Sequence, residues 1–499
     1  MNAPTGVNVM WNTAIFAVAV VCIPFTALFG AGPTLGFVAV LAPVASATTA
    51  YFVLRKLTGR AAASALAAAL YGFGPFFVGQ NGHVHLSIAV FPPLLLYFGH
   101  RLLIRQDSSP VRTGIWLGIC TGLQLLISEE IAALAVIVAG VAVAALAAAY
   151  PRQVAHRVRR SAIGIGVAGL TAIVVAGVPL GYQFFGPLAL PHGVLPTSQR
   201  LDLAGLVRPS GLQYYASDAD VLANKAFPAN GVENTGYLGW ALIGVVLAMC
   251  IAMIIRRDRF AYWWLITTVG AVVLSLGTPL VIDGNKIGPA PWALLRRLPT
   301  FDGVVVVRFT LITTLLVALM LAWGLAKLSG RAYLVGLVVV AAALVPLRPY
   351  DRYNAILPLT TPRFFTTSAV DEIPSGSTVF LMPYAPRPQP MAKVMVWQIH
   401  SHLRFKIIGG YSVFNRHGRM TYASDLPAFA KVLLAMDAGA EPTPAQLAAA
   451  HESVRPSGVR FIVIGDEQAD AGHVIRNAVD LTGCAPRRSA DVTLCELRR

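Results

Sequence analysis

The amino-acid sequence predicts an all-α polytopic membrane bundle of about ten transmembrane helices, followed by a small C-terminal α/β domain outside the cytoplasm. Three observations support this prediction. First, the chain of 499 residues is 56% hydrophobic and only 12% charged, whereas soluble domains are about 45–50% apolar and about 25% charged. Second, long apolar runs recur between residues 34 and 347, and a spanning helix needs about 20 such residues. Third, the basic residues gather in alternate short loops.

The apolar runs define the predicted transmembrane domain, residues 34–349. We expect its spans at 34–54, 61–79, 86–104, 112–128, 131–150, 161–182, 237–255, 262–281, 309–326 and 332–347. An earlier segment, 12–31, is also apolar but contains Pro24. It is compatible with either a further span or a helix that lies at the outer interface.

Loop charges predict the orientation. The basic residues of alternate loops are Arg55, Lys56, Arg60, Arg101, Arg105, Arg112, Arg152, Arg157, Arg159, Arg160, Arg256, Arg257, Arg259, Lys327 and Arg331. The intervening turns GQNGHVH and SEE contain no Lys or Arg. Because cytoplasmic loops carry the excess of basic residues, the chain is expected in the plasma (inner) membrane with outer loops at 183–236 and 282–308. This distribution also explains the net charge of +16 without a nucleic-acid partner.

Residues 350–499 have the pattern of a small α/β domain. Short apolar runs at 377–384 and 460–467 predict buried strands. Helices are predicted at 424–437 and at 443–454, where Thr443-Pro444 forms a capping pattern. Strands that alternate with helices favour an α/β fold.

Cys484 and Cys495 flank a polar turn in this domain. A hairpin centred on Pro486–Ser489 would bring the two cysteines nearly opposite each other. Disulfides persist in the oxidising compartment outside the cytoplasm, so a Cys484–Cys495 bond is expected. The alternative is a pair of free buried thiols, which a shift of one residue in the hairpin register would produce.

Eight stretches together resemble the GT-C superfamily of membrane glycosyltransferases, in particular its actinobacterial-type branch. They are PTGVNVMWNT (4–13), YFVLRKLTGR (51–60), YGFGPFFVGQNGHVHL (71–86), QLLISEE (124–130), ENTGYLG (233–239), LSLGTPL (274–280), PWALLRRLPTFDGVVVVRF (291–309) and KIIGGY (406–411). The resemblance implies an inverting enzyme that takes a sugar from a polyprenyl-phosphate donor. The acceptor would be a cell-envelope glycan or glycolipid at the outer face of the lipid membrane.

The chain departs from the GT-C pattern near its start. Members carry an acidic residue, usually Asp, in the first outer loop, whereas no Asp or Glu precedes Asp107 here. Residues 1–33 resemble only the end of that loop and the interfacial helix behind it. Either the chain start is assigned to an internal methionine, which we favour, or the usual base has been lost.

Several acidic residues are candidates for the catalytic base. Glu129 and Glu130 lie between two apolar segments, where a charge is costly unless it is paired or hydrated. Inverting transfer needs a group that takes the proton of the acceptor hydroxyl. Glu233 and Asp202 in the outer loop are further candidates. The alternative is that Glu129 and Glu130 mark a helix turn capped by Ser128, and that the loop acids are solvated.

Basic and aromatic residues are the candidates for binding the donor. Arg308 precedes the apolar run from Phe309, and a guanidinium holds phosphate oxygens in a bidentate manner. His83 and His85 are expected on the same outer side and are further candidates for phosphate contact. Lipid-facing or helix-capping roles are the alternatives for these residues. Additional candidates in the outer segments are Arg296, Arg297, Tyr214, Tyr215 and Trp11.

The sequence gives no support for a cofactor. A His-x-His pair is a weak metal signal because zinc sites use three or four ligands, so no metal site is predicted. Two other classes of function stay open beside the enzyme. One is a non-catalytic scaffold or glycan-binding protein, and the other is a transporter of a lipid-linked sugar, for which the sequence shows no paired broken helices.

Overall fold

The computed structural model describes residues 1–191, 197–298, 301–350, 360–384, 393–422, 425–466, 468 and 470–497. The chain divides into two compact units. The transmembrane unit contains Thr13–Tyr182 and Val194–Ala355, and the sheet unit contains Met1–Asn12, Gln183–Gly193 and Ile356–Arg499. The sheet unit thus includes two segments beyond the predicted C-terminal domain: the first twelve residues and a stretch of the outer loop.

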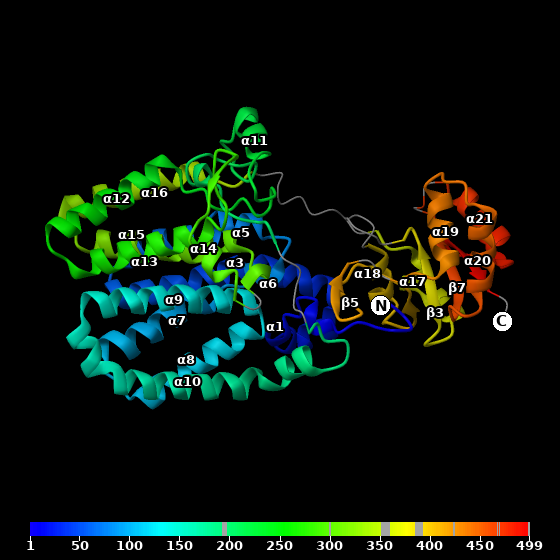
Figure 1. Cartoon of the computed structure of the whole chain (residues 1–499), viewed down its shortest axis with the longest axis horizontal. Coiled ribbons are helices and arrows are strands. Elements are labelled where there is room, and N and C mark those ends of the chain that lie inside the picture. Colours follow the sequence, from blue (N-terminus) through cyan, green and yellow to red (C-terminus); the bar gives the residue numbers. More distant parts are fainter. Residues whose placement is uncertain are drawn as a thin grey trace. The chain divides into compact units, whose positions relative to one another are not determined.

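The transmembrane unit is built almost entirely from helices (Figure 1). They are α1 (Phe16–Val21), α2 (Ile23–Phe29), α3 (Ala31–Thr58), α4 (Ala61–Phe73), α5 (Pro75–Gly79), α6 (Val84–Ser87), α7 (Phe91–His100), α8 (Pro110–Leu125), α9 (Glu129–Ala149), α10 (Pro151–Phe185), α11 (Asp218–Asn224), α12 (Gly239–Ile255), α13 (Arg259–Ser275), α14 (Trp292–Leu295), α15 (Thr310–Ala326) and α16 (Gly330–Leu344). A short hairpin of β1 (Leu280–Ile282) and β2 (Asn285–Gly288) lies between α13 and α14.

Each predicted span contains helical structure, but the predicted span 262–281 is too long at its end, because α13 ends at Ser275 and β1 begins at Leu280. Among the described residues, seven helical segments are long and apolar enough to cross a membrane. They are Ala31–Thr58, Ala61–Gly79, Val84–Arg105, Glu129–Ala149, Pro151–Phe185, Val306–Ala326 and Gly330–Leu347. Two shorter apolar helices are α12 and α13. The helical bundle is therefore confirmed, whereas the total of ten crossings stays a prediction.

Helix α15 forms the centre of the transmembrane unit. It packs against α3, α4, α9, α12, α13 and α16, and nearly all of its side chains are buried. A helix that is apolar all round is stable when other helices surround it. In contrast, α10 exposes Ile173, Val174 and Val178, as expected of a helix that faces lipid. The first residues of α15 are consequently held rigidly by the surrounding helices, so side chains beside them have well-defined positions.

The sheet unit contains a five-stranded mixed sheet with strand order β4-β3-β7-β9-β8. The strands of this sheet are β3 (Thr378–Met382), β4 (Lys406–Ile407), β7 (Val459–Gly465), β8 (Ala485–Ser489) and β9 (Val492–Glu496). A separate two-stranded hairpin is formed by β5 (Phe414–Arg416) and β6 (Arg419–Thr421). The helices of the sheet unit are α17 (Arg363–Thr366), α18 (Lys393–His400), α19 (Ala428–Asp437), α20 (Pro444–Val454) and α21 (Ala471–Thr482). Strand β3 runs parallel to β4 and β7, and β9 runs antiparallel to β7 and β8.

Both faces of this sheet are buried. Successive side chains of a strand point to opposite faces, so each strand contributes to two hydrophobic cores. Phe380 and Ile462 belong to the core that α19, α20 and α21 cover. Leu381 and Val463 belong to the opposite core, which contains Trp397 of α18. This explains the continuous apolar runs at 377–384 and 460–467. The predicted α/β domain, including the Thr443 cap, is confirmed for its described residues.

The predicted disulfide is confirmed. Cys484 and Cys495 are bonded, with Cα atoms 5.4 Å apart. The predicted position of the turn is wrong: Pro486–Ser489 lie in β8, and the turn is formed by Ala490 and Asp491. Pro486 pairs with Cys495, and Cys484 directly precedes β8. Both cysteines are buried in the core beneath α19 and α21. The bond therefore closes the open end of the β8–β9 hairpin, next to the end of α21.

Candidate functional site

Three of the predicted candidates, Arg308, Glu130 and Glu233, meet in one ionic cluster within the transmembrane unit. Arg308 donates from Nε to Oε2 of Glu233 over 3.1 Å. It also donates from Nη2 to the other oxygen of Glu233 and from Nη1 to Oε2 of Glu130. Two parallel N–H···O bonds to one carboxylate are the strongest geometry that an Arg–carboxylate pair adopts. The guanidinium is therefore held by both glutamates at once.

Different elements bring these three side chains together. Arg308 lies in a 3-10 turn (Val306–Phe309) directly before α15, and its neighbours Val307 and Phe309 are buried. Glu130 lies in the first turn of α9, whose cap Ser128 accepts a hydrogen bond from the N–H of Ile131. Acidic residues are favourable at a helix N-terminus because of the helix dipole.

Glu233 belongs to the loop before α12. Its backbone N–H donates to Oδ1 of Asn230 over 3.0 Å, and Glu233 itself is buried. The bonded partners are 178 and 75 positions apart in the sequence, so only the packing of α9, α12 and α15 brings them together.

Burial makes this cluster energetically expensive to disturb. The exposed fractions of the side chains are 12% for Arg308, 25% for Glu130 and 4% for Glu233. One guanidinium faces two carboxylates, so the cluster carries an excess of negative charge when all three groups are ionised. Removing one partner from a buried ion pair typically costs about 3–5 kcal/mol, because the remaining charge stays uncompensated.

Gln80 extends the cluster towards His83. The Gln80 side chain is fully buried and donates from Nε2 to Oε2 of Glu233 over 2.9 Å. Its Oε1 lies 2.7 Å from Nδ1 of His83. The site is thus a chain of contacts that runs from His83 through Gln80 and Glu233 to Arg308 and Glu130. Gln80 was not predicted, although it stands in the GQNGHVH turn three residues before His83.

The two histidines lie next to each other, and their predicted position on the outer side of the membrane stays a prediction. The ring centroids of His83 and His85 are 6.0 Å apart, with the rings edge to face. Burial is the main cause that lowers the pKa of His83 below its usual value, and the Arg308 guanidinium lowers it further, while Glu233 acts in the opposite direction. His83 is therefore neutral at pH 7.

Asp202 has a structural role. Its carboxylate is buried and accepts hydrogen bonds from the backbone N–H groups of Ala204, Asp283 and Gly284, at 2.9, 2.8 and 2.8 Å. These contacts cap a 3-10 turn and hold the tip of the β1–β2 hairpin. The three hydrogen bonds account for the burial of Asp202 and leave it little capacity to act as a base.

The remaining candidates lie apart from the cluster contacts. Arg296 and Arg297 are exposed, and Tyr214 lies beneath Arg348, with the guanidinium carbon 4.2 Å from the ring centre. Tyr215 stacks edge to face on Tyr214. In the sheet unit, Trp11 donates from Nε1 to the carbonyl of Gln183 over 2.8 Å. Glu129 is partly buried and engaged in an interaction of its own.

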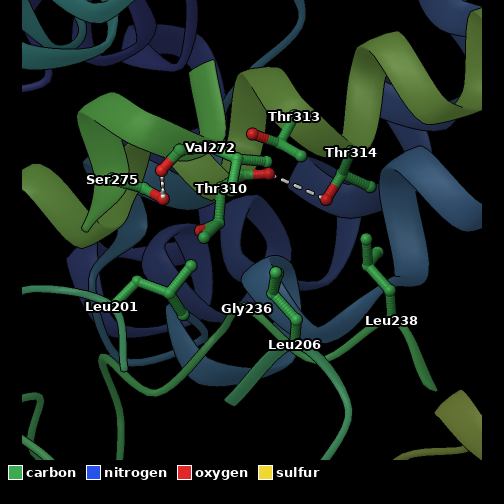
Figure 2. A pocket seen from close by; sticks show the side chains of 9 residues that line it. All are labelled: Leu201, Leu206, Gly236, Leu238, Val272, Ser275, Thr310, Thr313 and Thr314. Carbon is green, nitrogen blue, oxygen red and sulfur yellow. Dashed lines mark hydrogen bonds between the residues drawn. The ribbon is translucent and has the colours of Figure 1, made fainter. Parts of the chain in front are cut away.

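Figure 2 shows a small pocket. Two of its lining residues, Thr310 and Gly236, follow Arg308 and Glu233 of the cluster closely in the sequence. The pocket is lined by Leu201, Leu206, Gly236, Leu238, Val272, Ser275, Thr310, Thr313 and Thr314. Its hydroxyl groups are already engaged: Ser275 donates to the carbonyl of Val272, and Thr314 donates to that of Thr310. Thr310 is also bonded to Thr235. Apolar walls and satisfied hydroxyls are typical of a packing defect rather than of a binding site.

In the part of the chain that the structure describes, no group of three or more His, Cys, Asp or Glu side chains is arranged to hold a metal ion. The cluster combines two carboxylates with a guanidinium, and a cation such as Arg308 disfavours a metal at the same position.

Comparison with known proteins shows a family and a fold. A model of the family described as a domain of unknown function (DUF6311) matches residues 1–346 of the chain. The chain belongs to the DUF6311 family. The whole ionic cluster of this DUF6311 chain lies within the matched residues. No curated protein sequence matches the chain.

Among solved structures, the DUF6311 chain is similar to the arabinofuranosyltransferase AftD from Mycobacteria, with a TM-score of 0.55 and 14% sequence identity. The match covers 99% of this chain but only 36% of the AftD chain. ArnT from Cupriavidus metallidurans in the apo state matches with a TM-score of 0.45 and 10% identity, over 96% of this chain and 86% of that chain. The likeness to AftD shows a GT-C-like fold, as the sequence resemblance implies, and the apolar helices make the protein an integral membrane protein.

Proposed function

We propose that this protein is a membrane glycosyltransferase that transfers a sugar from a polyprenyl-phosphate donor to a cell-envelope glycan or glycolipid. The main support is the ionic cluster: a buried arginine clamped by two glutamates at the start of the central helix of a GT-C-like fold. Such a charged group in a membrane protein is a functional candidate by default, since it is expensive to keep.

In this proposal Arg308 contacts the phosphate of the donor. A guanidinium has five N–H donors, and the three hydrogen bonds to Glu130 and Glu233 leave two of them for a ligand. The hydrogen bonds to Glu233 and Glu130 orient the Arg308 guanidinium towards the phosphate. The excess negative charge of the two glutamates suits the positive charge that develops on the sugar ring when the anomeric bond breaks. His85, beside His83, is a further candidate for contact with the phosphate.

The reaction is proposed at the outer face of the plasma (inner) membrane. The positive-inside pattern supports this placement, because the short turns GQNGHVH and SEE beside the cluster contain no Lys or Arg, whereas the alternate loops contain many. The Cys484–Cys495 disulfide supports it as well, because disulfides are rare in reducing compartments. The sheet unit is accordingly proposed to lie outside the cytoplasm.

The proposed function is tested with the purified protein in lipid nanodiscs. The substrates are synthetic polyprenyl-phosphate pentoses and hexoses, offered with the glycan and glycolipid fractions of the source envelope. We expect one of the donors to lose its sugar to an acceptor, with one polyprenyl phosphate released per sugar transferred, as measured by mass spectrometry. The Arg308→Gln protein is expected to be inactive. Folded wild-type protein that transfers no sugar from any donor would argue against the proposal.

A further inference from the structure

Both glutamates of the ionic cluster are engaged by the Arg308 guanidinium. Glu233 accepts hydrogen bonds from Arg308 Nε, Arg308 Nη2 and Gln80 Nε2, and its side chain is only 4% exposed. Glu130 uses Oε2 for Arg308. Its other oxygen, Oε1, is buried, and among the described residues no donor is in hydrogen-bond geometry with it. Glu233 is therefore saturated, and the Glu130 carboxylate is shared with the Arg308 guanidinium, which lowers its basicity.

The contacts of Gln80 determine which nitrogen of His83 carries the proton. Gln80 Nε2 faces two groups that only accept, Oε2 of Glu233 at 2.9 Å and the carbonyl of Val232 at 3.4 Å. Both contacts require the NH₂ end of the amide at that position, so Oε1 faces His83. Because Oε1 only accepts, Nδ1 of His83 must be the donor across the 2.7 Å contact.

The other ring nitrogen of His83 is consequently the basic one. In a neutral imidazole with a proton on Nδ1, Nε2 carries the lone pair. His83 is partly exposed, and the only hydrogen bond of its ring to described residues is the one from Nδ1 to Gln80. We propose that His83, held in this tautomer by Gln80 and through it by Glu233, is the general base that takes the proton of the acceptor hydroxyl. This inference rests on the proposed glycosyl transfer.

The step balances without a further reactant. The acceptor oxygen forms a bond to the anomeric carbon while the bond from that carbon to the phosphate oxygen breaks, with inversion at the carbon. The hydroxyl proton moves to Nε2 of His83, and polyprenyl phosphate leaves as the anion opposite Arg308. The imidazolium then returns its proton to water, and the neutral tautomer is restored by the Gln80 contact.

The surroundings of His83 fit a base that is free at neutral pH. The charged or titratable groups that face it are Arg308, Glu233 and His85. Burial and Arg308 lower the pKa of His83 and so favour its neutral form. A bound phosphate anion opposes the field of Arg308 and makes the imidazole a better proton acceptor when substrate is present.

The test uses His83→Asn and His83→Ala in the nanodisc assay with the donor that the wild-type protein accepts. Asparagine keeps an N–H near the position of Nδ1, and therefore the contact with Gln80, but lacks Nε2. We expect kcat to fall about 100-fold or more, with donor affinity nearly unchanged. The acidic limb of the kcat/KM–pH profile, which reports the free enzyme and in wild type lies below the usual imidazole pKa, should disappear. Added imidazole should restore activity to His83→Ala in proportion to its unprotonated fraction.

Two further variants distinguish the roles. Gln80→Met removes the contact that selects the tautomer, so we expect a smaller loss of kcat with the pH limb retained but shifted. His156→Asn, on the exposed face of α10, is the matched control and should behave as wild type. If His83→Asn weakens donor binding and keeps the pH limb, His83 is a phosphate ligand and the inference is wrong. Unchanged kcat in His83→Asn overturns it as well, whereas an inactive wild-type protein removes the proposed function itself.

Discussion

Replacing Arg308 with alanine is expected to abolish sugar transfer and to destabilise the transmembrane unit. The donor phosphate loses its guanidinium, and loss of one well-placed charge-stabilising donor typically costs about 100-fold to 1,000-fold in rate. Glu130 and Glu233 then face each other without a cation in a buried site, at a cost of about 3–5 kcal/mol. Arg308→Lys should recover part of the stability but little activity, since an ammonium lacks the planar fork. Thermal unfolding and single-turnover transfer measure the two effects.

A neutral version of the cluster separates these effects. The triple variant Arg308→Gln, Glu130→Gln, Glu233→Gln leaves no uncompensated charge, so its unfolding temperature should lie near that of wild type while transfer stays absent. Arg112→Ala, on the exposed start of α8, is the control and should change neither quantity. Wild-type turnover in Arg308→Ala would remove Arg308 from the reaction.

The second large effect is expected for Glu233→Gln. The three groups around the Glu233 carboxylate are all donors: Nε and Nη2 of Arg308 and Nε2 of Gln80. A glutamine of the same shape turns its own NH₂ towards at least one of them. We expect that the bidentate pair is lost and that the Arg308 guanidinium changes its orientation. As a result, kcat should fall about 100-fold or more. Glu233→Asp keeps the charge but is shorter, so its activity should be intermediate.

The matched control for this variant is Asp283→Asn. Asp283 also pairs with an arginine, Arg208, but its side chain is 54% exposed. Exposed ion pairs contribute only about 0–1 kcal/mol, so stability and transfer should stay close to wild type. If Glu233→Gln were as mild as Asp283→Asn, the buried pair would not be what positions Arg308.

Much of the fold was predictable because its determinants are local. Apolar runs of about 20 residues can only be helices in lipid, where every backbone polar group must be satisfied internally. The sheet was predictable for a similar reason, since uninterrupted apolar runs such as 377–384 fit a strand that is buried on both faces. The inclusion of Met1–Asn12 and Gln183–Gly193 in the sheet unit was not predicted, because contacts between distant segments leave no periodic signal.

The candidate site was predictable residue by residue but not as an assembly. Arg308, Glu130 and Glu233 each stood out as a charge beside an apolar run, yet their pairing depends on helix packing across 75 and 178 positions. Gln80 was missed because a neutral amide in a polar turn carries no signal by itself. Asp202 was considered a candidate base because sequence alone does not show that backbone N–H groups of the β1–β2 hairpin saturate its carboxylate.

The most direct test of this account is the position of the donor phosphate. The measurement is a cryo-electron microscopy structure of the protein in nanodiscs, with a phosphonate analogue of the donor whose bond to the sugar cannot break. The account predicts phosphonate oxygens within hydrogen-bond distance of Arg308 and a sugar whose anomeric carbon faces the His83 side of the cluster. An analogue bound elsewhere, with Arg308 still enclosed by Glu130 and Glu233, would contradict it.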